Sequence, residues 1–416
     1  MPRKMRDSGI AWIGEVPEGW KVETGKYRYQ VQAGAPFDSQ LFSNEKGFPL
    51  IRIRDITSGH CETFYNGEYS GDYIVHNEDL LIGMDGDFNV RWWKGGDALL
   101  NQRCCRVIVS DKLERKFLSY AIPFHLLRVN ELAYSTTVKH LSNGDVYNAK
   151  LPIPPRNEME KIVYFLGEKC AAIDAAVEET KKGIEEYKAW KVSAIVDAVA
   201  HGVRNDALRD CGIDWIGKTP FHWNTYRIIN LYREVSERGD DSLPILSVSI
   251  NTGVSDKELS DEEQERVFIR SEDKSKYKRV QPGDLTYNMM RAWQGAFGAV
   301  RVNGMVSPAY VVARPKVEMD SRYVEYLLRS PNATREMQRY SRGIADFRLR
   351  LYWPEFKNIR IPCPPLEEQR EIADYLDAKC VAIDALISEN EKLIEDLDLY
   401  KRSLIYEYVT GKREVA

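Results

Sequence analysis

Arginine, amide and aromatic side chains gather in short clusters whose chemistry suits contact with nucleic acid. Arginine forks can pair with guanine, Asn and Gln amides can pair with adenine, and Arg or Lys can neutralise phosphates. In the first half of the chain these residues are Arg52, Arg54, Arg91, Trp92, Lys94, Asn101, Gln102, Arg103, Lys139 and His140. In the second half they are Tyr287, Asn288, Arg291, Trp293, Gln294, Arg342, Arg348 and Arg350. The pattern predicts two DNA-contacting surfaces, one in each half.

The alternative is that these residues serve only the fold. The tryptophans of both clusters would then be core residues, and many of the arginines would be solvated salt-bridge partners. Residues 91–96, RWWKGG, have the composition of an exposed loop with cations beside aromatic rings. Arg52 and Arg54 alternate along a strand-like run, which would place both on one face of a sheet.

One stretch matches a nucleotide-binding loop, but its surroundings argue against such a site. Residues 212–219, GIDWIGKT, fit the P-loop pattern letter for letter. A working loop follows a buried strand and opens a helix, whereas polar residues precede this stretch and Pro220 follows it at once. A sister stretch at 9–16 keeps the glycines and the tryptophan but lacks the Lys and Thr. We therefore expect no ATP site here.

The sequence offers no other recognisable catalytic or metal signature. The six histidines and seven cysteines show no zinc spacing, the carboxylates form no known nuclease set, and no adenine-methylation motif occurs. We expect a non-catalytic protein with no metal and no directly bound cofactor. No apolar run approaches the roughly 18 residues of a membrane span, and the N-terminus does not resemble a signal peptide, so a cytoplasmic location is expected.

The segments that must position the two clusters occur as an internal repeat along the chain. Three phrases recur: GIAWIGEVPEGW (9–20) as GIDWIGKTPFHW (212–223), LPIPP (151–155) as IPCPP (361–365), and KCAAIDA (169–175) as KCVAIDA (379–385). The blocks between them, about 21–150 and 224–360, share little sequence identity. One short pattern recurs in both: Asp79-Leu80 with Met84 corresponds to Asp284-Leu285 with Met289. The repeat predicts one scaffold carrying two diverged surfaces.

Each repeat ends in a long acidic segment with heptad periodicity. Residues 157–202 and 366–411 follow paired prolines and end at glycines, as helices do. Their cores, 157–200 and 366–409, together carry a net charge of −10, whereas the rest of the chain carries +6. The expected seam is Val163, Leu166, Cys170, Ile173, Val177 and Ile184, with Ala373, Leu376, Cys380, Ile383, Ile387 and Ile394 in the second copy.

An acidic helix with one apolar seam must bury that seam. We expect the two helices to pair antiparallel about a pseudo-two-fold axis, as a rod of roughly 65 Å, with Thr180 and Asn390 as polar register markers. Ordinary bundle packing inside one globular domain is the alternative.

With this architecture, several phrases resemble the specificity subunits of type I restriction–modification enzymes, and the likeness covers essentially the whole chain. Beside the repeated phrases above, they are PLIRIRDI (49–56), EDLLIGMDGDF (78–88), RWWKGG (91–96), LLNQR (99–103), STTVKHLS (135–142), LPILSVS (243–249), GDLTYNMMRAWQGAFG (283–298), VSPAYVV (306–312), RGIADFRLRLYW (342–353) and PPLEEQREIADYLD (364–377). Any one phrase is a weak sign, but their order is specific.

The resemblance implies an α+β fold in which two α/β target-recognition domains, within 1–156 and 203–365, are separated by antiparallel coiled-coil helices, 157–202 and 366–411. Each domain would read one half of a bipartite, asymmetric site in double-stranded DNA. Two methyltransferase subunits carrying S-adenosylmethionine would dock on the helices, and an ATP-driven restriction subunit would join them.

Three other functions stay open at this point. The chain could be the specificity subunit of a related restriction class. It could be a coiled-coil scaffold that joins proteins without DNA. It could also be an enzyme that cuts or modifies DNA itself, although the sequence offers no site for that chemistry.

Overall fold

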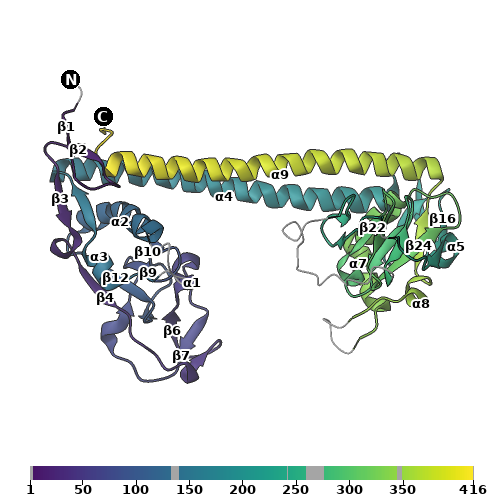
Figure 1. Cartoon of the computed structure of the whole chain (residues 1–416), viewed down its shortest axis with the longest axis horizontal. Helices are drawn as coiled ribbons and strands as arrows, with labels where there is room; N and C mark the ends of the chain where they lie inside the picture. Colours follow the sequence, from purple (N-terminus) through teal and green to yellow (C-terminus); the bar gives the residue numbers. More distant parts are fainter. Residues whose placement is uncertain (1–2, 133–139, 241, 259–275, 344–348, 416) are drawn as a thin grey trace. The chain divides into compact units, whose positions relative to one another are not determined.

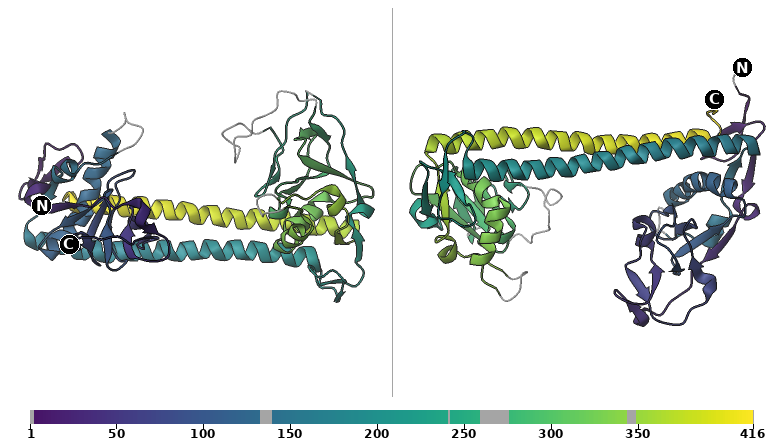
Figure 2. Two further views of the ribbon diagram at one scale, coloured as in Figure 1. Left: turned by 90° about the horizontal axis from the view of Figure 1, so that it is seen from below. Right: turned by 180° about the vertical axis from the view of Figure 1, so that it is seen from behind.

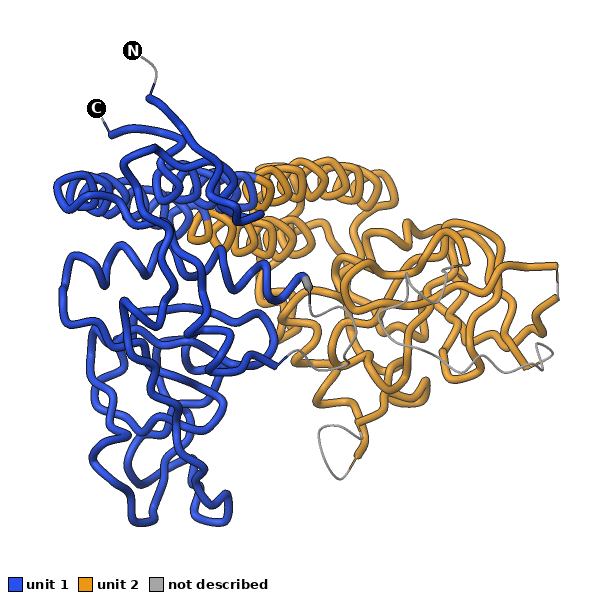
Figure 3. The backbone as a smooth tube through the Cα atoms, turned by 60° about the vertical axis from the view of Figure 1, so that its left-hand side comes forward, with its two compact units in different colours: residues 1–180, 393–416 blue, residues 181–392 orange. Residues whose placement is uncertain are grey.

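The chain forms two compact units that share two long helices. The computed structural model describes residues 3–132, 140–240, 242–258, 276–343 and 349–415. One unit comprises residues 1–180 and 393–416, and the other comprises residues 181–392 (Figure 3). The chain therefore leaves the first unit within one long helix and returns within the other, so neither helix belongs to a single unit.

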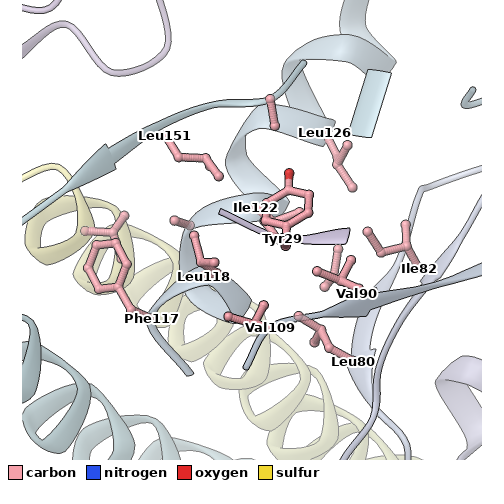
Figure 4. Close-up of a cluster of buried hydrophobic side chains, with 14 of the residues drawn as sticks. Tyr29, Leu80, Ile82, Val90, Val109, Phe117, Leu118, Ile122, Leu126 and Leu151 are labelled. Atoms are coloured by element: carbon pink, nitrogen blue, oxygen red, sulfur yellow. The ribbon is translucent and has the colours of Figure 1, made fainter. Parts of the chain in front are cut away.

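An antiparallel sheet covered by one helix forms the centre of the first unit. Its strand order is β10-β9-β12-β4. Side chains of this sheet and of α2 share one buried core with Tyr29, whose hydroxyl donates to the Val146 carbonyl at 2.7 Å (Figure 4). The bounds are β4 Gln30–Ala33, β9 Leu80–Gly83, β10 Val90–Trp92, β12 Cys104–Ile108 and α2 Lys112–Leu132.

A second sheet, of order β5-β7-β6-β11-β8, lies beside this centre in the same unit. Its elements are β5 Phe42–Ser43, β6 Phe48–Ile51, α1 Ile53–Ser58, β7 Thr63–Tyr65, β8 Ile74–Val75 and β11 Ala98–Leu100. Short pairs complete the unit: β1 Met5–Asp7 with β2 Glu15–Pro17, and β3 Lys21–Thr24 with β13 Lys150–Ile153, the latter preceded by α3 Asn143–Tyr147.

The second unit repeats the central sheet in the order β22-β21-β24-β17. Its elements are β17 Tyr232–Val235, β21 Leu285–Asn288, β22 Phe297–Ala299 and β24 Tyr310–Pro315, with α6 Ser321–Arg329 and α7 Pro331–Tyr340 packed on it. The matching Asp-Leu and Met residues noted in the sequence begin and follow the equivalent inner strands β9 and β21: each aspartate directly precedes its strand and each methionine directly follows it. A duplicated scaffold therefore underlies the two dissimilar blocks.

Shorter elements surround this second sheet. They are β14 Leu208–Asp210, β15 Lys218–Pro220, β16 Asn224–Arg227, α5 Ile228–Leu231, β18 Val248–Ser249, β19 Gly253–Val254, β20 Lys278–Val280, β23 Gly304–Val306, α8 Trp353–Phe356 and β25 Arg360–Cys363. Strand β16 pairs with β25 as β3 pairs with β13, so both units close in the same way.

The long helices are α4 Arg156–His201 and α9 Leu366–Val409, and they run antiparallel (Figures 1 and 2). In the first unit Lys401 pairs with Asp174, and in the second Lys191 pairs with Asp384 at 2.6 Å. The expected seam residues are buried, except Ile387 and Ile394, which are half-buried. None of the helices in the described ranges is long and apolar enough to cross a lipid bilayer.

The polar side chains of Thr180 and Asn390 form hydrogen bonds within their own helices. The Thr180 hydroxyl donates to the Ala176 carbonyl at 2.8 Å, and the Asn390 amide donates to the Leu386 carbonyl at 2.7 Å. Each is thus satisfied by the backbone of its own helix. Lys191 and Lys401, which continue the seam in the same heptad register, each form an ion pair with the other helix beside the buried apolar seam.

Candidate nucleic-acid interface

Each unit carries the same small cap, a hairpin followed by a buried tryptophan. Trp20 Nε1 donates to a carboxylate oxygen of Glu158 at 2.8 Å, and Trp223 Nε1 donates to Glu368 at 2.9 Å. These glutamates lie in the first turns of α4 and α9. Each cap therefore contacts the first turn of a long helix, and the two caps account for the repeated phrases at 9–20 and 212–223.

The stretch that matches a phosphate loop, 212–219, is the turn of the second cap. Strands β14 and β15 pair antiparallel across it, and the Gly212 N–H donates to Asp210 at 2.8 Å. The first cap has the same turn, with the Gly9 N–H donating to Asp7 at 2.9 Å. A phosphate loop leads from a strand into a helix, so this stretch has a different geometry.

A carboxylate–guanidinium pair recurs on the central sheet of both units. Arg106 of β12 contacts Asp79 at 2.9 Å, and Arg314 of β24 makes two contacts with Asp284, at 2.9 and 3.0 Å. Asp284 is almost completely buried. In the first unit the pair joins β12 to the residue before β9, and in the second it joins β24 to the residue before β21. These side chains therefore support the sheet and are not free to bind DNA.

Most candidates in the first unit lie at the surface. Arg52, Arg54, Arg91, Lys94, Gln102, Arg103 and His140 are exposed, Trp92 and Asn101 are half-buried, and Lys139 lies outside the described residues. The strand-like reading of Arg52 and Arg54 was wrong, because β6 ends at Ile51 and α1 begins at Ile53. The Asp55 carboxylate accepts the Arg52 N–H at 2.8 Å, which starts the helix.

The RWWKGG stretch is only partly a loop. Arg91 and Trp92 belong to β10, and the Arg115 guanidinium lies 5.7 Å from the Trp92 ring centre. Trp93 is 1% exposed, and its Nε1 donates to the Gly96 carbonyl at 2.6 Å. Trp93 is therefore a core residue, as the alternative interpretation allowed.

The second unit requires a correction. Tyr287 and Asn288 lie in β21 and are buried, and the Asn288 side chain accepts the Met290 N–H at 3.0 Å. Neither side chain is exposed for contact with DNA, because all four residues of β21 are buried. Gln294, Arg342 and Arg350 are exposed, Arg291 and Trp293 are half-buried, and Arg348 lies outside the described residues.

In the first unit, the side chains of Asp85, Arg103 and His140 lie together just after strand β9. The Asp85 carboxylate lies 2.6 Å from His140 Nδ1 and 3.5 Å from Arg103 Nη1. Arg103 and His140 are about half exposed, at 55% and 50%, whereas Asp85 is 24% exposed. The Asp85 carboxylate is thus an acceptor beside two more exposed donors, Arg103 and His140. The sequence did not single out Asp85, although it lies within the EDLLIGMDGDF phrase.

Within the described ranges, one group has metal-ligand geometry. Ligand atoms of Asp206, His222 and Glu368 lie within 4.8 Å of one another. Glu368 already contacts His222 at 2.8 Å and Arg204 at 3.6 Å. A guanidinium beside the carboxylate opposes a second cation. The group therefore fits a link between the second cap and α9.

Comparison with known proteins decides the family. A family model described as the type I restriction modification DNA specificity domain matches residues 17–186 and, a second time, residues 236–395. The chain belongs to this specificity family. The double match agrees with the duplicated caps, sheets and helices, and the resemblance noted in the sequence is confirmed.

Relatives of this specificity-family chain match it over nearly its full length. The type I restriction enzyme EcoBI specificity subunit of Escherichia coli is 29% identical over 99% of this chain and 90% of its own length. The MjaVIII specificity subunit of Methanocaldococcus jannaschii is 22% identical over 96% of this chain and 94% of its own. A solved structure from a study of assembly and conformational transition in the type I R-M system has a TM-score of 0.67 at 16% identity, over 96% and 99% of the two chains, which shows a shared fold.

Proposed function

We propose that this chain is the DNA-recognition subunit of a type I restriction–modification complex and that each unit reads one half of a bipartite, asymmetric DNA site. One observation carries the proposal. The two units share a sheet order and an Asp–Arg pair at the same place on the sheet, yet the exposed residues around their inner strands differ. A duplicated scaffold that carries two different surfaces suits recognition of two different DNA sequences.

The exposed arginine, lysine and amide side chains support binding to DNA. Phosphate contacts would supply affinity and base-edge contacts would supply specificity. The long helices carry a net charge of −10 whereas the rest of the chain carries +6, which disfavours DNA along the helices and leaves them to protein partners. Two methyltransferase subunits would dock there, and a restriction subunit would join that core.

The chain itself would be non-catalytic. S-adenosylmethionine and ATP would bind to the partner subunits, and methylation of a base would take place in the methyltransferase. The caps and the buried ion pairs of this chain use its polar groups for structure, which supports a role in recognition and assembly.

Footprinting of the complex with its methyltransferase partner tests this function. We expect two short protected base blocks separated by an unread gap, and binding that weakens steeply as salt rises. One continuous recognised sequence, or DNA modification by the purified chain without a partner, would overturn the proposal.

A further inference from the structure

We propose that each unit reads bases at one equivalent junction, where the turn after the inner strand meets the segment that enters the last short helix. In the first unit the junction consists of Asp85, Arg103 and His140. In the second it consists of Met290, Arg342 and Arg350. This inference rests on the proposed function and narrows it to particular side chains.

The same backbone bond builds both junctions. The Leu141 N–H donates to the Met84 carbonyl at 2.7 Å, and the Leu351 N–H donates to the Met289 carbonyl at 2.9 Å. Met84 and Met289 directly follow β9 and β21, and both leucines are fully buried. The scaffold thus fixes one point in each unit, while the neighbouring side chains are free to differ.

In the first unit, Asp85 orders the two donors beside it. A backbone bridge joins Asp85 to His140, and the carboxylate accepts from His140 Nδ1 at 2.6 Å. A histidine that donates through Nδ1 keeps Nε2 as an acceptor when the ring is neutral. The Arg103 backbone carbonyl accepts the Met84 N–H at 2.9 Å, which anchors that arginine to the same turn.

The second unit offers a different set at the same place. Arg342 and Arg350 exchange two backbone hydrogen bonds of 2.9 Å, and the Arg342 guanidinium contacts Glu355 at 2.6 Å. Met290 follows the anchoring Met289 and is 45% exposed. The junction therefore combines exposed guanidinium groups with an apolar side chain.

These two sets match different base edges. Arginine forks pair with guanine O6 and N7, a ring or carboxylate acceptor pairs with an amino group of cytosine or adenine, and an apolar side chain packs on the thymine methyl. We assign Arg103, His140, Met290 and Arg350 as base-contacting residues. Asp85 is a positioning residue, because it lies beneath the two donors and orients them.

The test uses the full chain assembled with its methyltransferase partner and a library of DNA sites randomised in both halves. Arg103→Gln should lower the preference at one base pair of one half-site by about tenfold, the usual effect of losing a two-pronged arginine contact. Asp85→Asn should relax preference in the same half. Arg350→Gln should act only on the other half.

Arg156→Ala is the matched control, because it removes another exposed arginine that is paired with an aspartate, Asp111, at 2.7 Å. Its base preference should equal that of the parent chain. If the parent reads a bipartite site and the junction variants keep every base preference, this inference fails while the proposed function stands. If the parent itself shows no bipartite preference, the proposed function fails as well.

Discussion

At the residue scale, the Asp–Arg pair that occurs in both units differs between them in burial, and burial affects how much an ion pair contributes to stability. Arg314 is 13% exposed and Asp284 only 1%, and the hydrogen bonds that Arg314 donates to Asp284 raise the pKa of Arg314 above its usual range. Arg106 and Asp79, at 15% and 20%, keep more contact with water. The same interaction should therefore contribute differently to the stability of the two units.

We expect Asp284→Asn to lower the free energy of unfolding of the second unit by about 3 kcal/mol, because it leaves a buried guanidinium short of its main partner. Asp79→Asn should cost less, about 1–2 kcal/mol. Urea unfolding of the full chain, followed by hydrogen exchange in each central sheet, measures both. Equal losses in the two variants would contradict the argument from burial.

We expect His125 to make the first unit sensitive to acid. It lies in α2, and burial lowers its pKa below the usual value because the charged ring loses solvation. The neutral ring therefore stabilises the fold fully above the unfolded-state pKa of about 6.5, and this contribution is lost as the pH falls through the folded-state pKa.

The melting temperature should fall between pH 7 and pH 5, and His125→Gln should remove part of that fall. His60→Gln is the control, since His60 is exposed. A pH dependence that is the same in both variants would argue against His125.

Single residues were also where the sequence was least informative. Arginine and lysine positions at the surface could be predicted, because charged side chains are seldom buried. Tyr287 and Trp93 could not be placed, because Tyr and Trp suit both a core and a DNA surface. Asp85 escaped notice because its role depends on His140, 55 residues away, and only tertiary structure brings the two together.

At the element scale, the helix pair repeats one contact in each unit. Lys191 with Asp384 and Lys401 with Asp174 are equivalent pairs, and each lysine tip leaves the seam to reach a carboxylate on the other helix. Both aspartates are more than half exposed, at 57% and 59%. Solvent therefore screens the pairs, and we expect them to influence the register of the helices more than the stability.

A double-mutant cycle on Lys191 and Asp384 should give a coupling free energy below about 1 kcal/mol. The exchanged pair, Lys191→Asp with Asp384→Lys, should recover most of the loss caused by either change alone. Melting curves of the four proteins measure it, and Lys401 with Asp174 in the unchanged unit serves as an internal reference. No recovery in the exchanged protein would mean that the ion pair does not determine the register.

The helices were predictable for the same physical reason that makes them stable. A heptad repeat over more than forty residues is a strong and local signal, so α4, of 46 residues, and α9, of 44, begin within a residue of the expected positions. The short strands were not predictable in detail. Most have two to four residues, and their pairing depends on contacts distant in sequence.

At the scale of the whole molecule, the duplication predicts that the two units read the bases and the helix pair sets the spacing between the half-sites. If the helix pair sets the gap between the half-sites, lengthening both helices should widen the gap and leave the bases read unchanged. Seven residues inserted after Thr180 and seven after Asn390 keep the heptad and add about 10 Å of helix, or about three base pairs. Methylation mapping measures the gap. Altered bases with an unchanged gap would contradict a spacing role for the helices.

The most direct test exchanges one reading surface. Residues 224–360 are replaced by the corresponding block of a relative that reads a different sequence, and the sites methylated with the partner subunit are mapped across a genome. We predict that one half-site changes to that of the relative, while the other half-site and the gap stay as they were. A change in both halves, or in neither, would contradict the claim that the two units read DNA independently.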